Sequence, residues 1–295
     1  MSELREGLRL PGNESSPDRI QRMLVGGLLG LAAVAWWATS RLMAGMDAGP
    51  GTDPGSLGFY SGSWAVMMAA MMLPSLGPAV IAYGDLRREH AESGGGFGAG
   101  ARLAASAAVD PSAAIFVLGY LALWALAGLG GYVVLEAGRS LDGGLFAWAR
   151  AGRWTAVGVL ALAAVYELTP RKRACLTRCR GRGLAPAVER DGWVGALQMG
   201  FAHGGWCLGC CWALMAALFA LGAMSLLWMV VIAGAIAVEK LLPWPRAGTI
   251  GVAALLVALA IGMAASPSRV PGLTIPHGRM AMQGMGSMGA GQPRR

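Results

Sequence analysis

Long stretches that are almost free of charged side chains constrain this chain more than any other feature. About seven such runs occur, at residues 23–44, 64–83, 113–135, 155–168, 193–221, 224–242 and 249–265. A helix needs about 20 apolar residues to cross the ~30 Å hydrocarbon core of a bilayer. With 55% hydrophobic and 14% charged residues, the chain also lies outside the usual composition of soluble domains. We therefore predict an all-α fold, a polytopic transmembrane helix bundle of about seven helices, with six as the alternative count.

The segments outside these runs are each too short to bury a hydrophobic core. The predicted organisation is a polar N-terminal segment at residues 1–22, a transmembrane helical domain at 23–265 and a flexible methionine-rich C-terminal tail at 266–295. Small residues let membrane helices approach closely, and the four-residue spacings from Gly26 to Gly30 and from Gly205 to Gly209 suit such contacts.

The basic residues predict how the bundle is oriented. If seven helices cross the membrane, most of the 24 Lys and Arg residues lie on the side of the N-terminus, many of them in the segment 171–190. The positive-inside rule then places the N-terminus in the cytoplasm and the tail outside, whereas six helices would reverse the tail. These loops also explain the net charge of +8. We thus expect a multi-pass protein of the cell membrane with the lipid bilayer, and no nucleic acid, as its partner.

The segment HGGWCLGCCWALM, residues 203–215, places one histidine and three cysteines inside an apolar run. At about 100° per residue, His203, Cys207 and Cys210 share one face of a helix, and Cys211 lies close beside it. Imidazole and thiolate are ligands for soft metals, although free cysteine also packs as a small hydrophobe. His203 and Cys210 are about 10 Å apart along such a helix, too far to bind one ion. A metal site therefore needs further ligands, unless the helix breaks after His203.

A second cysteine pair, Cys175 and Cys179, stands in YELTPRKRACLTRCRG, where Pro170 can begin a short helix. The spacing of four puts both thiols on one side, and the basic neighbours favour thiolates. The pair could bind metal, exchange disulfides with Cys207 and Cys210, or be incidental to a basic interfacial loop. It is expected near the cytoplasmic surface while Cys207 and Cys210 lie deep. Either the segment folds back into the bundle, two separate sites form, or the helix limits differ.

Methionines form a third group. On the second run, Met68 and Met72 are four residues apart, as are Met67 and Met71, and we expect Pro74 to interrupt the helix just beyond. Thioethers suit Cu(I), although methionine also fills irregular cores. The tail carries further candidate ligands: His277, Met280, Met282, Met285 and Met288.

Two acidic residues, Glu167 and Glu239, stand near the ends of apolar runs. We expect them to pair with the basic loop at the cytoplasmic surface. The alternative is a carboxylate that takes up a proton as a substrate or ion passes.

Four motifs occur together in order: WAVMMAAMMLPSLGPAVIAY, YELTPRKRACLTRCRG, GFAHGGWCLGCCWALMAALFALGAMSLLWM and AVEKLLPW. Over residues 64–244 the chain resembles the predicted metal-binding integral membrane proteins grouped as domain of unknown function 2182. The resemblance implies a location in the bacterial inner membrane. Its motifs fall on Met71, Met72, Pro74, Tyr166, Thr169, Pro170, Lys172, Cys175, Cys179, His203, Cys207, Cys210, Cys211, Trp212, Met215, Glu239 and Lys240.

The sequence therefore favours a membrane protein that binds a soft transition metal for trafficking or resistance, with copper expected and zinc the alternative. The candidate ligands are His203, Cys207, Cys210, Cys211, Cys175, Cys179, Met68, Met71 and Met72. A soluble protein that delivers the metal is a candidate partner. Two other hypotheses remain, a membrane thiol-disulfide oxidoreductase that uses the two cysteine pairs and a structural membrane subunit with packed cysteines; of the enzyme and non-enzyme interpretations, the non-enzyme one is favoured.

Overall fold

A computed structural model describes residues 16–44, 56–93, 111–140, 153–182, 192–222 and 225–266. Within these residues the regular elements are all helical, so the predicted all-α class is confirmed there. They are α1 (Ser16–Leu42), α2 (Leu57–Ser93), α4 (Pro111–Ser140), α5 (Arg153–Glu167), α6 (Pro170–Thr177), the π-helical η2 (Arg178–Arg182), α7 (Trp193–Leu221), α8 (Leu226–Leu241) and α9 (Pro245–Ala265).

Five of these helices are long and apolar enough to cross a membrane, which does not confirm the predicted count of seven. The candidate spans are Gln21–Leu42, Leu57–Leu86, Pro111–Val134, Trp193–Leu221 and Pro245–Ala265. The two other predicted spans correspond to α5 and α8, which have 15 and 16 residues. At 1.5 Å per residue, helices of this length extend about 24 Å or less, short of the ~30 Å hydrocarbon core.

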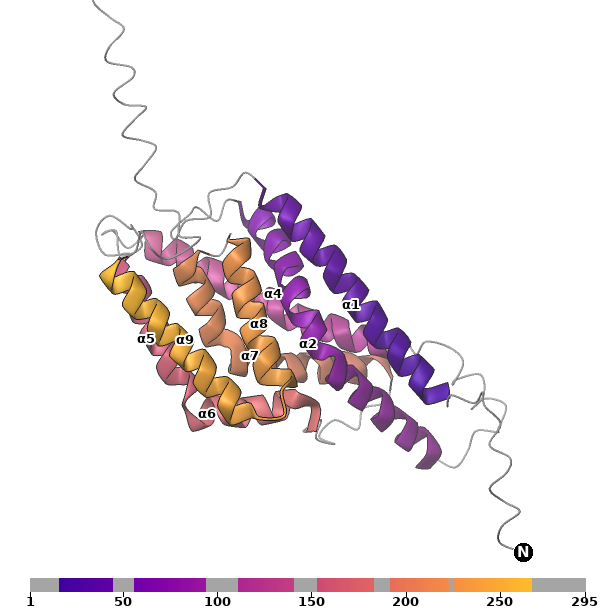
Figure 1. Cartoon of the computed structure of the whole chain (residues 1–295). Coiled ribbons are helices and arrows are strands. Elements are labelled where there is room, and N and C mark those ends of the chain that lie inside the picture. Colours follow the sequence, from indigo (N-terminus) through magenta and orange to yellow (C-terminus); the bar gives the residue numbers. More distant parts are fainter. Residues whose placement is uncertain are drawn as a thin grey trace, which may run out of the picture.

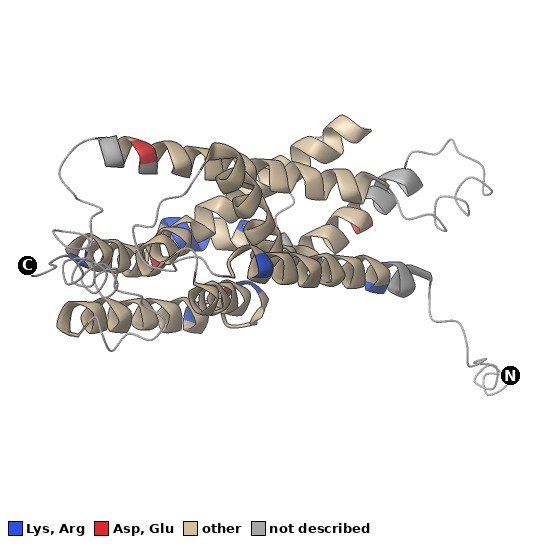
Figure 2. Ribbon diagram, turned by 90° about the horizontal axis from the view of Figure 1, so that it is seen from above, with Lys and Arg blue, Asp and Glu red and all other residues tan. Residues whose placement is uncertain are grey.

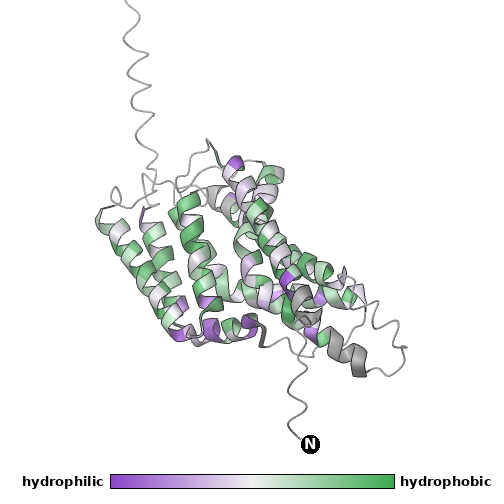
Figure 3. Ribbon diagram, turned by 45° about the vertical axis from the view of Figure 1, so that its right-hand side comes forward, coloured by the Kyte–Doolittle hydropathy of each residue, from purple (hydrophilic) through white to green (hydrophobic). Residues whose placement is uncertain are grey.

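Helix α7 lies at the centre of the arrangement (Figure 1). It packs against α4 on one side and against α5, α6 and α8 on others, while α1 lies on α2 and α5 lies beside α9. Charged residues are sparse along the helices (Figure 2). The ribbon is mostly hydrophobic, with hydrophilic residues gathered toward the end of the bundle where α6 lies (Figure 3). Of the elements that carry the candidate ligands, α6 and η2 contact α7, and α2 contacts η2 and α8.

Close backbone contact between helices occurs where glycine permits it, but largely not at the predicted positions. A Cβ at Gly119 would collide with a backbone carbonyl of α7, and one at Gly200 with a backbone carbonyl of α4. By contrast, a Cβ at Gly26 or Gly30 would meet nothing within 4 Å, so that expectation was wrong. At Gly209 an added Cβ would lie 2.9 Å from the sulfur of Cys175.

Helix α2 continues through Pro74 and Pro78, which corrects the expectation that Pro74 interrupts it. Proline removes a backbone donor and leaves a carbonyl without its usual partner, and such positions are tolerated inside packed helical bundles. Directly after Pro74, the hydroxyl of Ser75 donates to the carbonyl of Met72 at 2.9 Å. The methionine-bearing segment and Ser75 thus belong to one continuous, buried helix.

Candidate metal centre

The segment that carries Cys175 and Cys179 folds back onto α7. Helix α6 begins as expected at Pro170, and the side chain of Thr169 caps it by accepting from the backbone N–H of Lys172 at 3.2 Å. The chain then passes into the wider π-turn of η2, a conformation often found at functional sites. Both α6 and η2 contact α7. Of the alternatives left open by the sequence, the structure shows the return into the bundle.

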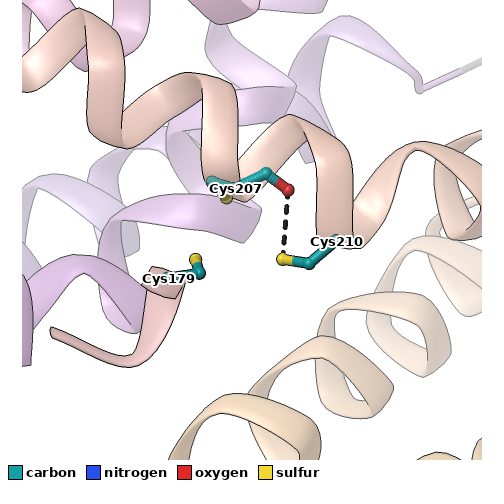
Figure 4. Close-up of side chains that lie close together, drawn as sticks. All are labelled: Cys179, Cys207 and Cys210. Atoms are coloured by element: carbon teal, nitrogen blue, oxygen red, sulfur yellow. Dashed lines mark hydrogen bonds between the residues drawn. The ribbon is translucent and has the colours of Figure 1, made fainter. Parts of the chain in front are cut away.

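Three cysteine sulfurs come together where η2 meets α7. The Sγ atoms of Cys179, Cys207 and Cys210 all lie within 4.8 Å of one another (Figure 4). Cys207 and Cys210 are fully buried and Cys179 is 5% exposed. With metal–sulfur bonds of about 2.3 Å, three sulfurs around one ion stand roughly 4 Å apart. Small side-chain rotations would therefore let this group hold a single metal ion.

The sulfur of Cys207 is also the meeting point of two polar side chains. The ammonium of Lys240, on α8, donates to Cys207 Sγ at 2.9 Å and to the hydroxyl of Ser75 at 3.1 Å. The hydroxyl of Tyr120, on α4, is hydrogen-bonded to the same sulfur at 3.0 Å. Lys240 supplies the positive charge that a buried thiolate requires, because an uncompensated ion is costly in an apolar interior.

The two remaining cysteines lie next to the group of three. Cys211 is buried, and its sulfur is 3.3 Å from that of Cys210. The thiol of Cys210 donates to the carbonyl of Cys207 at 3.1 Å. Cys175 faces α7 as well, but its sulfur lies against Gly209 and does not belong to the group of three. The i, i+4 cysteines thus both face the same stretch of α7, residues 207–210, but only Cys179 joins the group of three.

His203 is buried one turn before Cys207, outside the group of three. Its ring lies near those of Phe116 and Tyr120, with centroid distances of 5.9 and 6.0 Å. Tyr120 therefore contacts both the imidazole and the sulfur of Cys207.

The methionines of α2 lie on the side that faces the cysteines. Met68, Met71 and Met72 are buried, and Ser75 follows them at spacings of seven, four and three residues, on the same helical face. Lys240 donates hydrogen bonds to both Ser75 and Cys207. This face of α2 is therefore directed toward the cysteine group. The candidate ligands of the tail, from His277 onward, lie outside the described residues.

A second polar cluster is buried beside the first. The ammonium of Lys172 donates to Glu239 Oε2 at 2.7 Å and also to Glu167 Oε2. Burial alone would lower the pKa of Lys172, but Glu239 and Glu167 raise it above its usual value. The expectation that the two acids pair with the basic segment is met by Lys172. Their expected location at the surface is wrong, because Glu167, Lys172 and Glu239 are at most 1% exposed.

Sequence reasoning missed two members of this environment, Tyr120 and Ser75. Ser75 could have been found from its helical spacing to Met71 and Met72, whereas Tyr120 stands in an apolar run without any distinguishing spacing. The contact of Lys240 with a sulfur was also not foreseen, although Lys240 belongs to the resemblance motif.

Together, the apolar helices and the buried group of three thiols define an all-α protein with membrane-type helices and a candidate site for a soft metal. The profile of the PpoB2 family, described as a copper chaperone, matches residues 61–263. This segment is more than half of the chain, and the protein belongs to that copper chaperone family. Neither a curated protein nor a solved structure shows a significant match.

Proposed function

We propose that this protein is an integral membrane protein that binds copper as Cu(I), through Cys179, Cys207 and Cys210, for trafficking or resistance. The observation that carries the proposal is the convergence of three sulfurs from η2 and α7 in an apolar interior. Thiolate and thioether ligands select Cu(I) over hard cations. Membership of a copper chaperone family supports the same metal.

The other candidate ligands have secondary roles in this proposal. Cys211 and the thioethers of Met68, Met71 and Met72 receive the ion by ligand exchange as it moves along the face shared by α2 and α7. His203 acts at one end of that path, and Cys175, beside Gly209, is an auxiliary ligand next to the group of three. The burial of these side chains around the group of three sulfurs supports this arrangement, apart from Cys175, which is only partly buried.

The proposed setting is the cell membrane, as the resemblance to predicted metal-binding integral membrane proteins implies. The N-terminus lies in the cytoplasm, and the methionine-rich tail collects or releases copper on the opposite side, if the number of crossings is odd. A soluble protein delivers or accepts the metal. The apolar helices and the distribution of basic residues support this orientation.

Elemental analysis of the detergent-purified, reduced protein tests the proposal. About one copper per chain is expected, and a variant with Cys207→Ser and Cys210→Ser should lose it. Zinc in place of copper would keep the site and change its metal. Absence of metal, with Cys207 and Cys210 cycling between thiol and disulfide, would instead support the oxidoreductase. Absence of both behaviours would support the structural subunit. We favour copper because thiol exchange needs accessible thiols, and both residues are fully buried.

A further inference from the structure

The candidate ligands differ in how far they can be reached from outside the bundle. Four of the five cysteines are buried, and only Cys175 is partly exposed. His203 and the candidate methionines of α2 are at most 6% exposed. Among the candidate ligands within the described residues, the thiol of Cys175 is therefore the one that a Cu(I) donor meets at the surface.

Cys175 lies in a gap between two tryptophans of α7. At about 100° per residue, Gly209 stands about 60° around the helix from both Trp206 and Trp212, between the two. The two indole side chains are 36% and 48% exposed. A Cβ at Gly209 would lie 2.9 Å from the sulfur of Cys175, so an alanine there would push the thiol aside. The missing side chain of the glycine thus makes the room that this thiol occupies.

Contacts on both sides fix the walls of the gap. The guanidinium of Arg178, on η2, lies 4.2 Å from the ring centroid of Trp206. The ring of Tyr166 packs edge-on against Trp212 at 4.9 Å, and its hydroxyl donates to the carbonyl of Gly209. The place of the thiol therefore follows from the docking of α5, α6 and η2 against α7.

The outer side of α6 and η2, next to Cys175, is basic. Arg171, Arg173 and Arg178 are exposed, and hydrophilic residues gather at this end of the bundle (Figure 3). Arginine is costly in hydrocarbon, so this side meets water or lipid headgroups. A Cu(I) ion held by two thiolates is an anion, and a basic surface attracts it.

On its inner side, Cys175 adjoins the group of three sulfurs. It stands one helical turn before Cys179, and Gly209, against which its sulfur lies, directly precedes Cys210. An ion bound by Cys175 is therefore next to two of the three final ligands.

We propose that Cys175 is the transfer thiol of the metal centre. It takes Cu(I) from an anionic Cu(I)–thiolate complex at the basic side of α6 and η2, and passes the ion inward to Cys179 and Cys210. Such a complex is formed by small thiols and by soluble proteins with paired cysteines. This inference rests on the proposed copper-binding function.

Each step of the transfer exchanges one Cu–S bond for another. When Cys175 binds the ion, its thiol proton goes to the first thiolate that leaves the donor, and Cys179 replaces the second donor thiolate in the same way. Cys210 then takes the place of Cys175 and returns a proton to it. Cys207 adds as the thiolate beside Lys240. Copper remains Cu(I) throughout, and the donor leaves as two thiols.

The rate of loading tests this role. Cu(I) in its complex with excess glutathione is mixed with the reduced full-length protein in detergent, and protein-bound copper is measured after removal of the donor at set times. Cys175→Ser should load about tenfold more slowly, because thiol exchange depends on access, yet reach the same final copper content. Gly209→Ala should also load slowly. The matched controls are Ala174→Ser, at an exposed position of α6, and Gly205→Ala, where the Cβ has ordinary contacts.

The charge of the donor tests the basic surface. A variant with Arg171→Gln and Arg173→Gln should load about tenfold more slowly from the anionic glutathione complex, and no more slowly than the natural protein from the cationic complex with cysteamine. A peptide that holds Cu(I) through two cysteines among acidic residues serves as a third donor. Faster loading from the peptide than from glutathione would support a protein carrier as the source, and slower loading a small thiol. Equal slowing by the variant with anionic and cationic donors would overturn the role of the basic side.

Alkylation of the natural protein keeps the test decisive where a variant does not fold. N-ethylmaleimide should modify Cys175 first in the copper-free protein, and the singly modified protein should load as slowly as Cys175→Ser. Prior reaction of another cysteine, or loading of both altered proteins at the natural rate, would overturn this inference and leave the proposed function intact. Failure of the natural protein to hold copper from any donor would overturn the proposed function instead.

Discussion

The ammonium of Lys240 lies 2.9 Å from the sulfur of Cys207, in the interior of the helical bundle. Both residues are buried, and they belong to different helices, α8 and α7. A cation in this position makes it energetically acceptable to keep a thiolate away from water. The contact therefore prepares the cysteine group for a metal ion before one arrives.

Replacing Lys240 by Met should weaken Cu(I) binding. The substitution keeps the apolar stem of the side chain but removes a charge-assisted hydrogen bond, which contributes about 1.5–3 kcal/mol and so corresponds to roughly a ten- to hundredfold loss of affinity. Competition with a Cu(I) chelator of known affinity measures this change. The control is Arg246→Met, at an exposed position. Equal Cu(I) affinity of the two variants would argue against a role for the Lys240 ammonium.

The two cysteines of the α6 and η2 segment should differ in their effect on metal content. Cys179→Ser removes one of three gathered sulfurs and should reduce bound copper severely, whereas Cys175→Ser should retain it, because that sulfur lies against Gly209 outside the group. Elemental analysis and X-ray absorption at the copper edge measure the stoichiometry and the number of sulfur ligands. Loss of copper in the Cys175 variant alone would reverse this assignment.

The helical class and most of the candidate ligands could be predicted from local sequence patterns. Apolar runs of membrane-spanning length predict helices because a bilayer leaves the backbone few alternatives. The side of α7 that carries Cys207 and Cys210 follows from helical periodicity. The start of α6 at Pro170 follows from the fixed backbone angle of proline.

The meeting of Cys179 with Cys207 and Cys210 could only be named as one of several alternatives. It depends on the turn between α6 and η2 and on how α6 packs against α7, neither of which produces a sequence period. The burial of Glu167 and Glu239 was mispredicted for a similar reason. Charged residues near a helix end normally reach the surface, and only tertiary packing brings Lys172 between them.

The contact between α4 and α7 should be sensitive to a single added methyl group. In Gly200→Ala the new Cβ would collide with the backbone carbonyl of Phe116, which cannot rotate away. We expect a loss of about 1–3 kcal/mol, the usual effect of overpacking. Gly251→Ala, on α9, is the matched control because its Cβ would meet nothing within 4 Å. Thermal unfolding in detergent should show a lower midpoint for the first variant only; equal midpoints would contradict the close helix contact.

Replacing Lys172 by Met should destabilise the protein more than replacing Glu167 or Glu239 by Gln. It leaves the carboxyl groups of Glu167 and Glu239 buried without a cation, and breaking a buried ion pair in this way costs about 3–5 kcal/mol. Adding Glu167→Gln and Glu239→Gln to the same variant should restore most of the loss, because the buried charges are then gone. Denaturant titrations of the natural protein, Lys172→Met and the triple variant give their free energies of unfolding. A triple variant no more stable than Lys172→Met would show that the loss of stability comes from packing.

The pH dependence of stability provides an independent measure of the same cluster. Because Glu239 and Glu167 raise the pKa of Lys172, the stabilisation by its charge is fully present at neutral pH and is lost only as the pH rises through that raised value. The Lys172→Met variant should behave differently. Burial raises the pKa of Glu167 to about 8, and the variant lacks the ammonium that opposes this shift. Its stability should therefore be greatest in acid and decline as the pH rises toward neutrality. Parallel pH profiles for the two proteins would mean that the ammonium of Lys172 does not compensate the acids.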